Sequence, residues 1–216
     1  GLTSKPMQQM LNVPTPDFAP AWARHAVWYQ ILPERFASAN PANDPRSVHP
    51  WTSDWYALQP WERDTAKPLA ATLADRRYGG DLSGILQRLP YLQDLGVNAL
   101  YLNPVFDAPS HHKYDASTLH HVDVHLGPDP EGDRALMARE VGDDPSTWVW
   151  TAADRQLLEL VDAVHARGMR IILDGVFNHV GRRHRAFRDL LEKQRGSRFA
   201  GWFKVSSFAD EPGGFQ

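Results

Sequence analysis

The stretch IILDGVFNHVG, residues 171–181, begins as an apolar strand and then meets three polar side chains, Asp174, Asn178 and His179. A carboxylate on a buried strand destabilises a fold by roughly several kcal/mol unless a charged or hydrogen-bonding group pairs with it. Asp174 is therefore expected to face a partner, and the nature of that partner bears on what the chain does.

The composition is that of a globular protein. Hydrophobic residues make up 42% of the 216-residue chain, which carries a formal net charge of -3. Such a chain forms one ordinary domain, or at most two small ones, around a real core. The mild negative charge and the lack of a basic run exclude the electrostatic signature of a nucleic-acid-binding protein.

The chain contains no cysteine, so neither a disulfide framework nor a thiolate metal site can form. No apolar run reaches the roughly 18–20 residues of a membrane helix, and no membrane partner is expected. The first residues lack the hydrophobic region of a signal peptide. We expect a cytoplasmic location, although a secreted enzyme without cysteine has the same composition.

Apolar periodicity predicts an alternating order of strands and helices. The predicted strands are residues 26–33, 97–102 and 169–177. The predicted helices are residues 79–96, 151–168 and 186–194. Near-continuous apolar strands alternating with helices indicate a parallel sheet covered by helices.

Local signals mark the helix ends. In the first helix Asp81 is a suitable N-cap and Gly96 a suitable end, while Pro90 predicts a break into two short pieces. In the second helix Thr151 and Asp154 form a capping-box pattern. Its apolar face is predicted to consist of Leu157, Leu158, Val161 and Val164.

Polar side chains follow the second and third strands, namely Asn103, Asp174, Asn178 and His179. In parallel α/β folds the carboxyl ends of the strands hold the chemistry, whether the sheet is a closed barrel or an open Rossmann sheet. The sequence contains no G-x-G-x-x-G or G-K-[ST] phosphate loop, which argues against nucleotide binding.

Several motifs together resemble one known family. ILDGVFNHVG resembles D-x-V-x-N-H, the first signature region of the α-amylase family, glycoside hydrolase family 13. VWYQILPERFA is similar to its first barrel strand, and YGGDLSGILQRLPYLQDLGVNALYLNPVFDAPSHHKYD to its first helix, second strand and following loop. VDVHLG resembles the V-D-P-x-F-G turn, with Val124 in place of the proline. The resemblance covers residues 26–125 and 151–181, and PERFA and APSHHKYD resemble the neopullulanase, cyclomaltodextrinase and maltogenic amylase branch.

The resemblance implies a (β/α)8 barrel, which typically needs about 250 residues or more. The chain supplies the first three β/α units: residues 1–25 are predicted to be an extended lead-in and residues 26–216 the N-terminal portion of the barrel. The family carries its nucleophilic Asp on strand four, its acid/base Glu on strand five and a His-Asp pair on strand seven. No segment here resembles these, so the chain alone is expected to be inactive and to need the remainder of the barrel as partner.

The same resemblance implies roles for the polar residues near the third strand. Asp174 would hold an arginine that lies two residues before the nucleophile, and the alternative is a structural Asp held by backbone amides. His179 would donate to the 6-hydroxyl of the sugar at the cleaved position. In many α-amylases the residue that matches Asn178 binds calcium. In this branch the resemblance implies that Asn178 braces the loop.

The loop after the second strand is implied to complete the sugar site. Tyr114 would stack on the same sugar ring, since an aromatic face suits the C–H side of a pyranose and a cation-like transition state. Asp115 would orient the loop and His112 would line the site. The 8 tryptophans, several of them in predicted loops, serve either as further sugar platforms or as ordinary packing.

The segment FASANPANDP resembles a calcium loop of this branch. The oxygen ligands implied for Ca²⁺ are Asn40, Asn43, Asp44, Gly79 and Asp81. Only two of them carry charge, and because calcium affinity depends on ligand charge we expect a weak site. An ordinary Asn/Asp turn is the alternative. Residues 128–150, longer than the usual family link, are predicted to form an acidic, solvated loop.

The function implied is that of a retaining glycoside hydrolase acting on α-1,4-linked glucans, α-1,6-linked glucans or cyclodextrins. Three alternatives stay open at this point. An α-glucan glucosyltransferase of the same family uses the same covalent intermediate, and a barrel relative without its carboxylates would serve as a binding subunit. An unrelated α/β enzyme would use Asp174, Asn178 and His179 as its own centre. A homodimer is one option for the oligomeric state.

Overall fold

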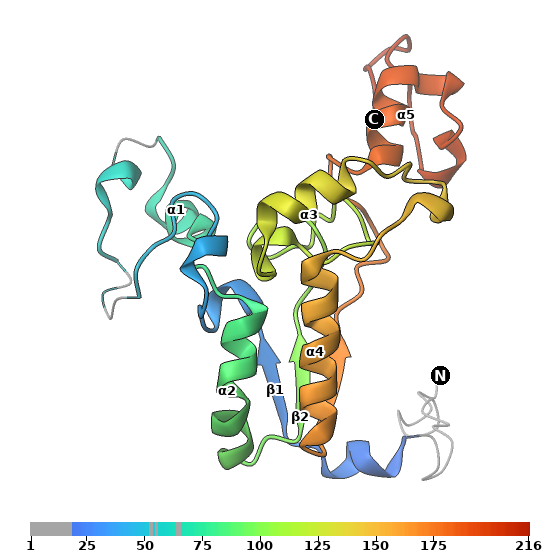
Figure 1. Cartoon of the computed structure of the whole chain (residues 1–216). Helices are drawn as coiled ribbons and strands as arrows, with labels where there is room; N and C mark the ends of the chain where they lie inside the picture. Colours follow the sequence, from blue (N-terminus) through green and yellow to red (C-terminus); the bar gives the residue numbers. More distant parts are fainter. Residues whose placement is uncertain (1–18, 52–53, 55, 64–65) are drawn as a thin grey trace, which may run out of the picture.

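Three parallel strands form one sheet in the order β1-β2-β3 (Figure 1). The computed structural model describes residues 19–51, 54, 56–63 and 66–216. The strands are β1 (Trp28–Ile31), β2 (Ala99–Leu102) and β3 (Arg170–Leu173). In register, Tyr29 lies beside Leu100 and Leu100 beside Ile171. The predicted parallel sheet is therefore confirmed, with strands shorter than the apolar segments that predicted them.

Helices connect the strands and extend beyond them. The α-helices are α1 (Leu69–Asp75), α2 (Leu82–Asp94), α3 (Pro130–Met137), α4 (Ala152–Ala166) and α5 (Arg185–Lys193). The 3-10 helices are η3 (Ala21–His25), η4 (Pro33–Arg35), η5 (Pro41–Asn43), η6 (Pro60–Glu62), η7 (Val124–Leu126), η8 (Pro145–Thr147), η9 (Gln194–Gly196) and η10 (Ala200–Trp202). None of the helices in the described part of the chain combines the length and the apolar character needed to span a bilayer.

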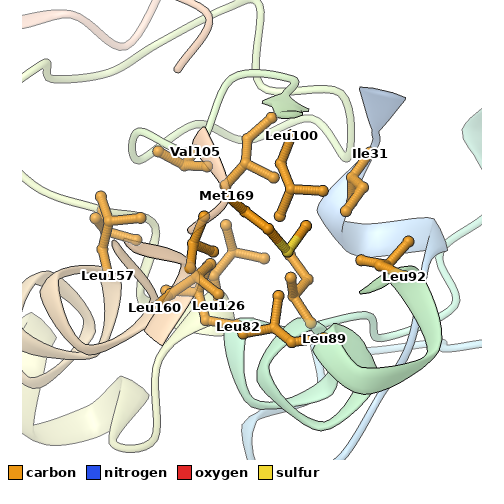
Figure 2. Close-up of a cluster of buried hydrophobic side chains, with 14 of the residues drawn as sticks. Ile31, Leu82, Leu89, Leu92, Leu100, Val105, Leu126, Leu157, Leu160 and Met169 are labelled. Atoms are coloured by element: carbon orange, nitrogen blue, oxygen red, sulfur yellow. The ribbon is translucent and has the colours of Figure 1, made fainter. Parts of the chain in front are cut away.

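The hydrophobic core lies between the sheet and the helices α2 and α4. Figure 2 shows Ile31 and Leu100 from the sheet meeting Leu89 of α2 and Leu160 of α4, and each of these side chains is almost fully buried. Burying such a side chain contributes about 1.5–3 kcal/mol. The stability of the three β/α units therefore rests on this one packed layer.

Within the described residues, no α-helix covers the opposite face of the sheet, and only Trp22 of η3 lies against its Trp28. Trp28 and Gln30 of β1 and Ile172 of β3 are exposed there, and Tyr101 of β2 is half-buried. Parallel sheets are ordinarily covered on both faces. This face thus presents large apolar and polar side chains together, which is the composition of a barrel interior near its site.

The prediction that Pro90 breaks the helix α2 was wrong. The helix runs continuously through Pro90, with Asp81 as its N-cap as predicted. Proline in a helix interior costs about 3 kcal/mol. The buried side chains Leu82, Ile85, Leu89 and Leu92 lie on both sides of it and offset that cost by burial. The helix ends before Gly96, which has a φ of 85°.

Two further expectations were wrong in detail. In α4 the capping box of Thr151 and Asp154 is confirmed, but Leu158 is 48% exposed and Leu160 is fully buried in its place. The third strand ends at Leu173 rather than at Phe177. Asp174 is the first residue past the strand, and its backbone N–H still donates to the carbonyl of Leu102, at 2.9 Å.

The segment 128–150 is only in part the acidic, solvated loop that its composition predicted, because it is mostly exposed but contains the helix α3. Its helix α3 places Asp133 in the interior, where the carboxylate accepts hydrogen bonds from the backbone N–H groups of Ala152 (2.7 Å) and Ala153 (2.9 Å). These N–H groups begin α4 and have no partner within that helix. The acidic residue therefore caps a neighbouring helix instead of facing water.

The lead-in expected at residues 1–25 lies mostly outside the described residues. Its described end forms the 3-10 helix η3 and is not extended there. Between β1 and α2, the described residues also contain the short helix α1.

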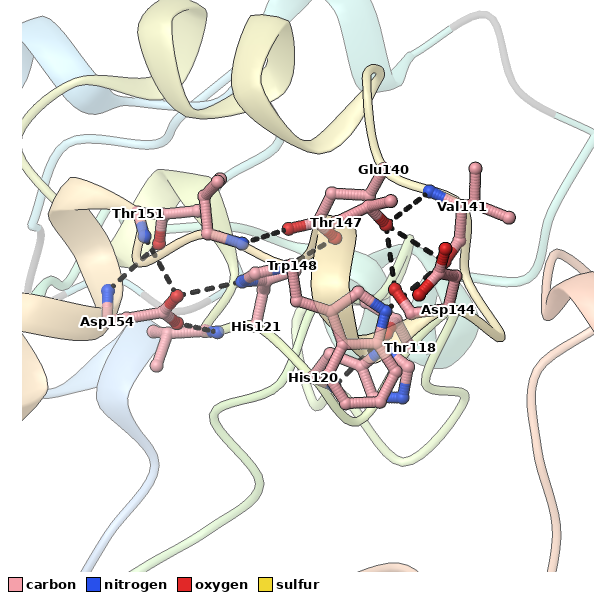
Figure 3. A network of polar contacts seen from close by, with 12 residues as sticks. Thr118, His120, His121, Glu140, Val141, Asp144, Thr147, Trp148, Thr151 and Asp154 are labelled. Carbon is pink, nitrogen blue, oxygen red and sulfur yellow. Dashed lines mark hydrogen bonds and ion pairs between the residues drawn. The ribbon is translucent and has the colours of Figure 1, made fainter.

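A buried histidine ties the segment after α3 to α4. His121 donates from Nδ1 to Asp154 and from Nε2 to Glu140, both at 2.8 Å (Figure 3). Because a carboxylate only accepts, both ring nitrogens carry protons and His121 is a cation. The hydrogen bond to Asp154 is the main reason that the pKa of His121 is raised to about 9, against the opposing effect of burial. His121 is therefore the charged centre of a three-residue network.

We expect Asp133→Ala to lower the free energy of unfolding by about 1–2 kcal/mol, because two buried N–H groups lose their acceptor. Urea and thermal unfolding measure the change. Glu131→Ala, on the exposed side of the same helix, is the matched control and should change stability little. Equal stability of the two variants would contradict the capping role.

His121→Gln should destabilise the protein in a pH-dependent manner. Because the folded pKa of about 9 lies above the ordinary 6.5, the stabilisation is complete below pH 6.5 and is lost as the pH rises through about 9. The difference in unfolding free energy between wild type and variant, measured from pH 6 to 9.5, should therefore shrink with rising pH. His165→Gln, exposed on α4, controls for loss of any imidazole. A difference that stays constant over this range would rule out a charged His121.

Candidate active site

Two loops meet at the carboxyl end of β3. The hydroxyl of Tyr114 donates to Asp174 Oδ2 at 2.7 Å, and His179 Nε2 donates to the backbone carbonyl of Tyr114 at 2.9 Å. Tyr114 comes from the loop after β2, while Asp174 and His179 follow β3. Both strands run in the same direction, so their ends share one edge of the sheet. Three residues singled out from the sequence are thus brought together.

The Asp174 carboxylate lies near two tyrosines. The hydrogen bond between the Tyr114 hydroxyl and Asp174 raises the pKa of Tyr114 to about 12. Burial raises the pKa of Tyr101, and the hydrogen bond and negative charge of Asp174 raise it further. Across the described residues, no ion pair joins Asp174 to a Lys or Arg side chain. The carboxylate therefore accepts a hydrogen bond from the Tyr114 hydroxyl here, and the arginine partner stays a prediction.

Tyr101 is a site residue that the sequence analysis missed. It belongs to β2, where the pattern ALYL showed only an apolar strand. The available signal was a tyrosine within that strand, since a buried Tyr hydroxyl needs a polar partner. The partner follows the neighbouring strand β3, and their proximity is not visible in the sequence.

The Tyr114 loop is braced by its own polar side chains. Ser110 donates to Asp115 Oδ1, and its hydroxyl lies 3.1 Å from His112 Nδ1. That same nitrogen accepts the backbone N–H of Tyr114 at 3.1 Å. Asp115 thus contacts the loop through Ser110, and His112 lies beside Tyr114, with ring centroids 5.9 Å apart.

A buried ion pair stabilises the Tyr114 loop. Lys113 Nζ lies 2.6 Å from Asp123 Oδ2, and both side chains are almost fully buried. Burial opposes ionisation of Asp123, but the Lys113 ammonium and two backbone N–H groups hold its pKa below the ordinary value. Lys113 has a φ of 59°, a left-handed conformation that costs energy for a non-glycine residue. The ion pair holds this strained residue directly before Tyr114, a support that the sequence analysis did not identify.

A cavity of about 510 Å³ lies beside these residues. Asn178 and His179 line it, together with the aromatic side chains of Phe187 and Trp202. Asn178 is exposed, and its amide nitrogen lies 3.4 Å from His179 Nδ1. A volume of this size, with aromatic walls and a few polar groups, is typical of a small-molecule site.

The five residues of the expected calcium site also come together. Asp81 accepts the backbone N–H of Asn40 at 2.9 Å, and Asn43 lies on the same carboxylate with its amide nitrogen at 3.4 Å. A Cβ atom at Gly79 would lie 2.2 Å from Asp44 Oδ1, so only glycine fits there.

Two oxygens of this cluster lack hydrogen-bond partners. Asn43 Oδ1 and Asp44 Oδ1 are buried and receive no hydrogen bond from the described residues. Burial and the negative charge of Asp81 raise the pKa of Asp44. Unpaired oxygens beside two carboxylates suit a hard cation such as Ca²⁺. The described residues contain no cluster of three or more His, Asp or Glu side chains with metal-binding geometry, so such a cation would depend on amide and carbonyl oxygens as well.

The chain matches the family model "Alpha amylase, catalytic domain" over residues 30–139 and 152–212, which leaves out residues 140–151. It is 42% identical over 189 residues to neopullulanase 2 of Thermoactinomyces vulgaris. It is 38% identical over 190 residues to an intracellular maltogenic amylase of Bacillus subtilis. Each match covers 88% of this chain, and it covers 26% and 25% of the two relatives, so the chain spans about a quarter of their length.

Solved structures agree with this assignment. The ligand-free cyclic alpha-maltosyl-(1→6)-maltose hydrolase of Arthrobacter globiformis superposes with a TM-score of 0.64 at 36% identity, covering 88% of this chain and 34% of that one. The match includes the parallel sheet, the Tyr114 loop and the segment that carries Asp174 and His179. The chain therefore belongs to the α-amylase family, glycoside hydrolase family 13, and forms the first three β/α units of its (β/α)8 barrel.

Proposed function

We propose that the whole protein is a retaining glycoside hydrolase that cleaves α-1,4-linked glucans, α-1,6-linked glucans or cyclodextrins. The observation that carries the proposal is the contact of Tyr114, Asp174 and His179 at the end of β3. Relatives named neopullulanase, cyclomaltodextrinase and maltogenic amylase support the substrate class.

Retaining hydrolysis needs two carboxyl groups about 5–5.5 Å apart, one as nucleophile and one as acid/base. In this family those groups belong to later strands, so we assign them to the remainder of the barrel. The residues of this chain position the sugar. The Tyr114 ring provides an aromatic face, and its hydrogen bond to Asp174 sets the tilt of that ring.

His179 is proposed to meet the 6-hydroxyl of the sugar through Nδ1. Its Nε2 already donates to the carbonyl of Tyr114 at 2.9 Å, so a sugar hydroxyl would compete at Nδ1 with the Asn178 amide nitrogen, which lies 3.4 Å away. The carbonyl bond also fixes the plane of the imidazole. Tyr114 and His179 thereby hold each other in the orientation that one sugar ring requires.

Asp174→Asn in the full-length protein should lower kcat/KM on β-cyclodextrin by about 100-fold or more. The amide keeps the acceptor for Tyr114 but removes the charge expected to hold the arginine beside the nucleophile. Reducing-sugar release measures the rate, and NMR of the first product tests for retention of the α-anomer. Asp162→Asn, exposed on α4, is the matched control. Unchanged turnover by Asp174→Asn would contradict this role.

We also propose that Asn40, Asn43, Asp44, Gly79 and Asp81 bind Ca²⁺. The support is the pair of unpartnered oxygens described above and the raised pKa of Asp44. Bound calcium would neutralise two neighbouring carboxylates. It would also fasten the turn after β1 to the start of α2, so its role would be structural.

Calcium should raise the thermal unfolding midpoint of the protein relative to EDTA by a few degrees when it is present at about 100 times its Kd. Asp44→Asn should abolish this difference, while Asp94→Asn, exposed at the end of α2, should keep it. Differential scanning calorimetry with either additive gives the result without any activity assay. Identical midpoints for wild type in calcium and EDTA would refute the site.

We propose a cytoplasmic location as well. The support is a relative named intracellular maltogenic amylase, 38% identical to this chain. Fractionation of cells that express the full-length gene, followed by immunoblotting, tests it.

A further inference from the structure

Residues 140–151 lie outside both matched parts of the family model, yet they are ordered and build one wall of a second cavity. This cavity has a volume of about 420 Å³. Its lining includes Glu140, Asp143 and Trp148 from this segment, and His120, His184 and Trp202 from other parts of the chain. The segment is therefore an addition to the family pattern that shapes a pocket.

The second cavity adjoins the first. His184 and Trp202 line both cavities, and the first one also contains Asn178 and His179. A linear ligand seated at His179 can thus pass Trp202 and continue toward Trp148. The path leads from residues of the family site to residues that the family model does not include.

Aromatic rings dominate the surface of this extension. The Trp148 ring lies against the imidazole of His120, with ring centroids 3.8 Å apart (Figure 3). Trp148 is 37% exposed and Trp202 is 68% exposed. Flat aromatic faces beside hydroxyl, imidazole and carboxylate groups match the chemistry of a sugar ring, which has apolar C–H faces and a polar rim. Glu140 and Asp143 are each paired with a cation, His121 and Arg185, that also lines the cavity, so the lining suits an uncharged ligand.

The wall is held rigidly. Glu140 bonds to His121 at 2.8 Å through one oxygen and accepts the backbone N–H of Val149 at 2.7 Å through the other. Asp143 pairs with Arg185 of α5 at 3.1 Å and also with Arg198. The segment is thus fastened at one end to His121 and at its middle to α5. A preformed wall lowers the ordering cost of binding.

We propose that residues 140–151 form an outer glucose-binding subsite, in which Trp148 and Trp202 contact a sugar unit of the α-glucan chain that occupies the His179 cavity. This inference rests on the proposed function and specifies its substrate class: chains long enough to reach from His179 to Trp148. Short maltooligosaccharides end before the subsite.

The test compares a long and a short substrate in the full-length protein. Trp148→Ala should raise KM for maltoheptaose by roughly 5- to 10-fold, the loss expected from one aromatic contact, while kcat changes less than about 2-fold. KM for maltotriose should stay the same. Trp150→Ala is the matched control, because Trp150 is 59% exposed in the same segment but does not line the cavity.

A general loss of structure in Trp148→Ala would raise KM for the long and the short substrate alike. Equal increases of KM for both substrates, or none for either, would overturn the subsite. If Trp148→Ala fails to fold, Trp148→Leu tests the same point, since leucine packs against His120 but offers no flat face to a sugar.

Failure of the proposed function can be told apart from failure of the subsite. If wild type binds maltoheptaose in calorimetric titration without cleaving it, the hydrolase proposal is wrong, and a 5- to 10-fold weaker Kd of Trp148→Ala still supports the subsite. If wild type neither cleaves nor binds maltoheptaose, both proposals are wrong.

Discussion

Parallel pairing of β1, β2 and β3 is the constraint on which the site depends. Because all three strands run the same way, the loops that follow them leave from one edge of the sheet. Tyr114 and Asp174, separated by 60 positions in the chain, consequently share a hydrogen bond of 2.7 Å. The helices α2 and α4 stabilise this arrangement by covering one face only, which leaves Tyr101 directed toward Asp174 on the other.

Between these elements the chain is long and irregular, and buried charges hold it in place. Lys113 with Asp123 supports the Tyr114 loop, Arg76 with Glu62 supports the segment after β1, and His121 joins Glu140 to Asp154. Each ion is paired and hydrogen-bonded, which is the condition under which a buried charge is tolerated. Apolar burial stabilises the sheet layer, whereas directional polar contacts order the loops that carry function.

The carboxylate of Asp174 differs from these structural charges. The carboxylates of those three networks meet cations, but Asp174 accepts a hydrogen bond from the Tyr114 hydroxyl and forms no ion pair in the described part of the chain. The two unpartnered oxygens beside Asp81 form a second polar cluster with unmet bonding capacity. Groups with such capacity are candidates for ligand binding, and the family motifs had indicated the residues of both clusters except Tyr101.

The sequence by itself determined the order of strands and helices, the helix caps at Asp81 and Thr151, and the identity of the family motifs, because these depend on neighbours within a few residues. Only the tertiary structure decided that α2 runs through Pro90, that Asp133 caps α4, and that Tyr114 donates to Asp174. In each case the deciding partner lies on another element, and burial or a hydrogen bond outweighs the local preference. The pocket wall at residues 140–151 belongs to the second group, since its carboxylates pair with His121, Arg185 and Arg198, which lie elsewhere in the chain.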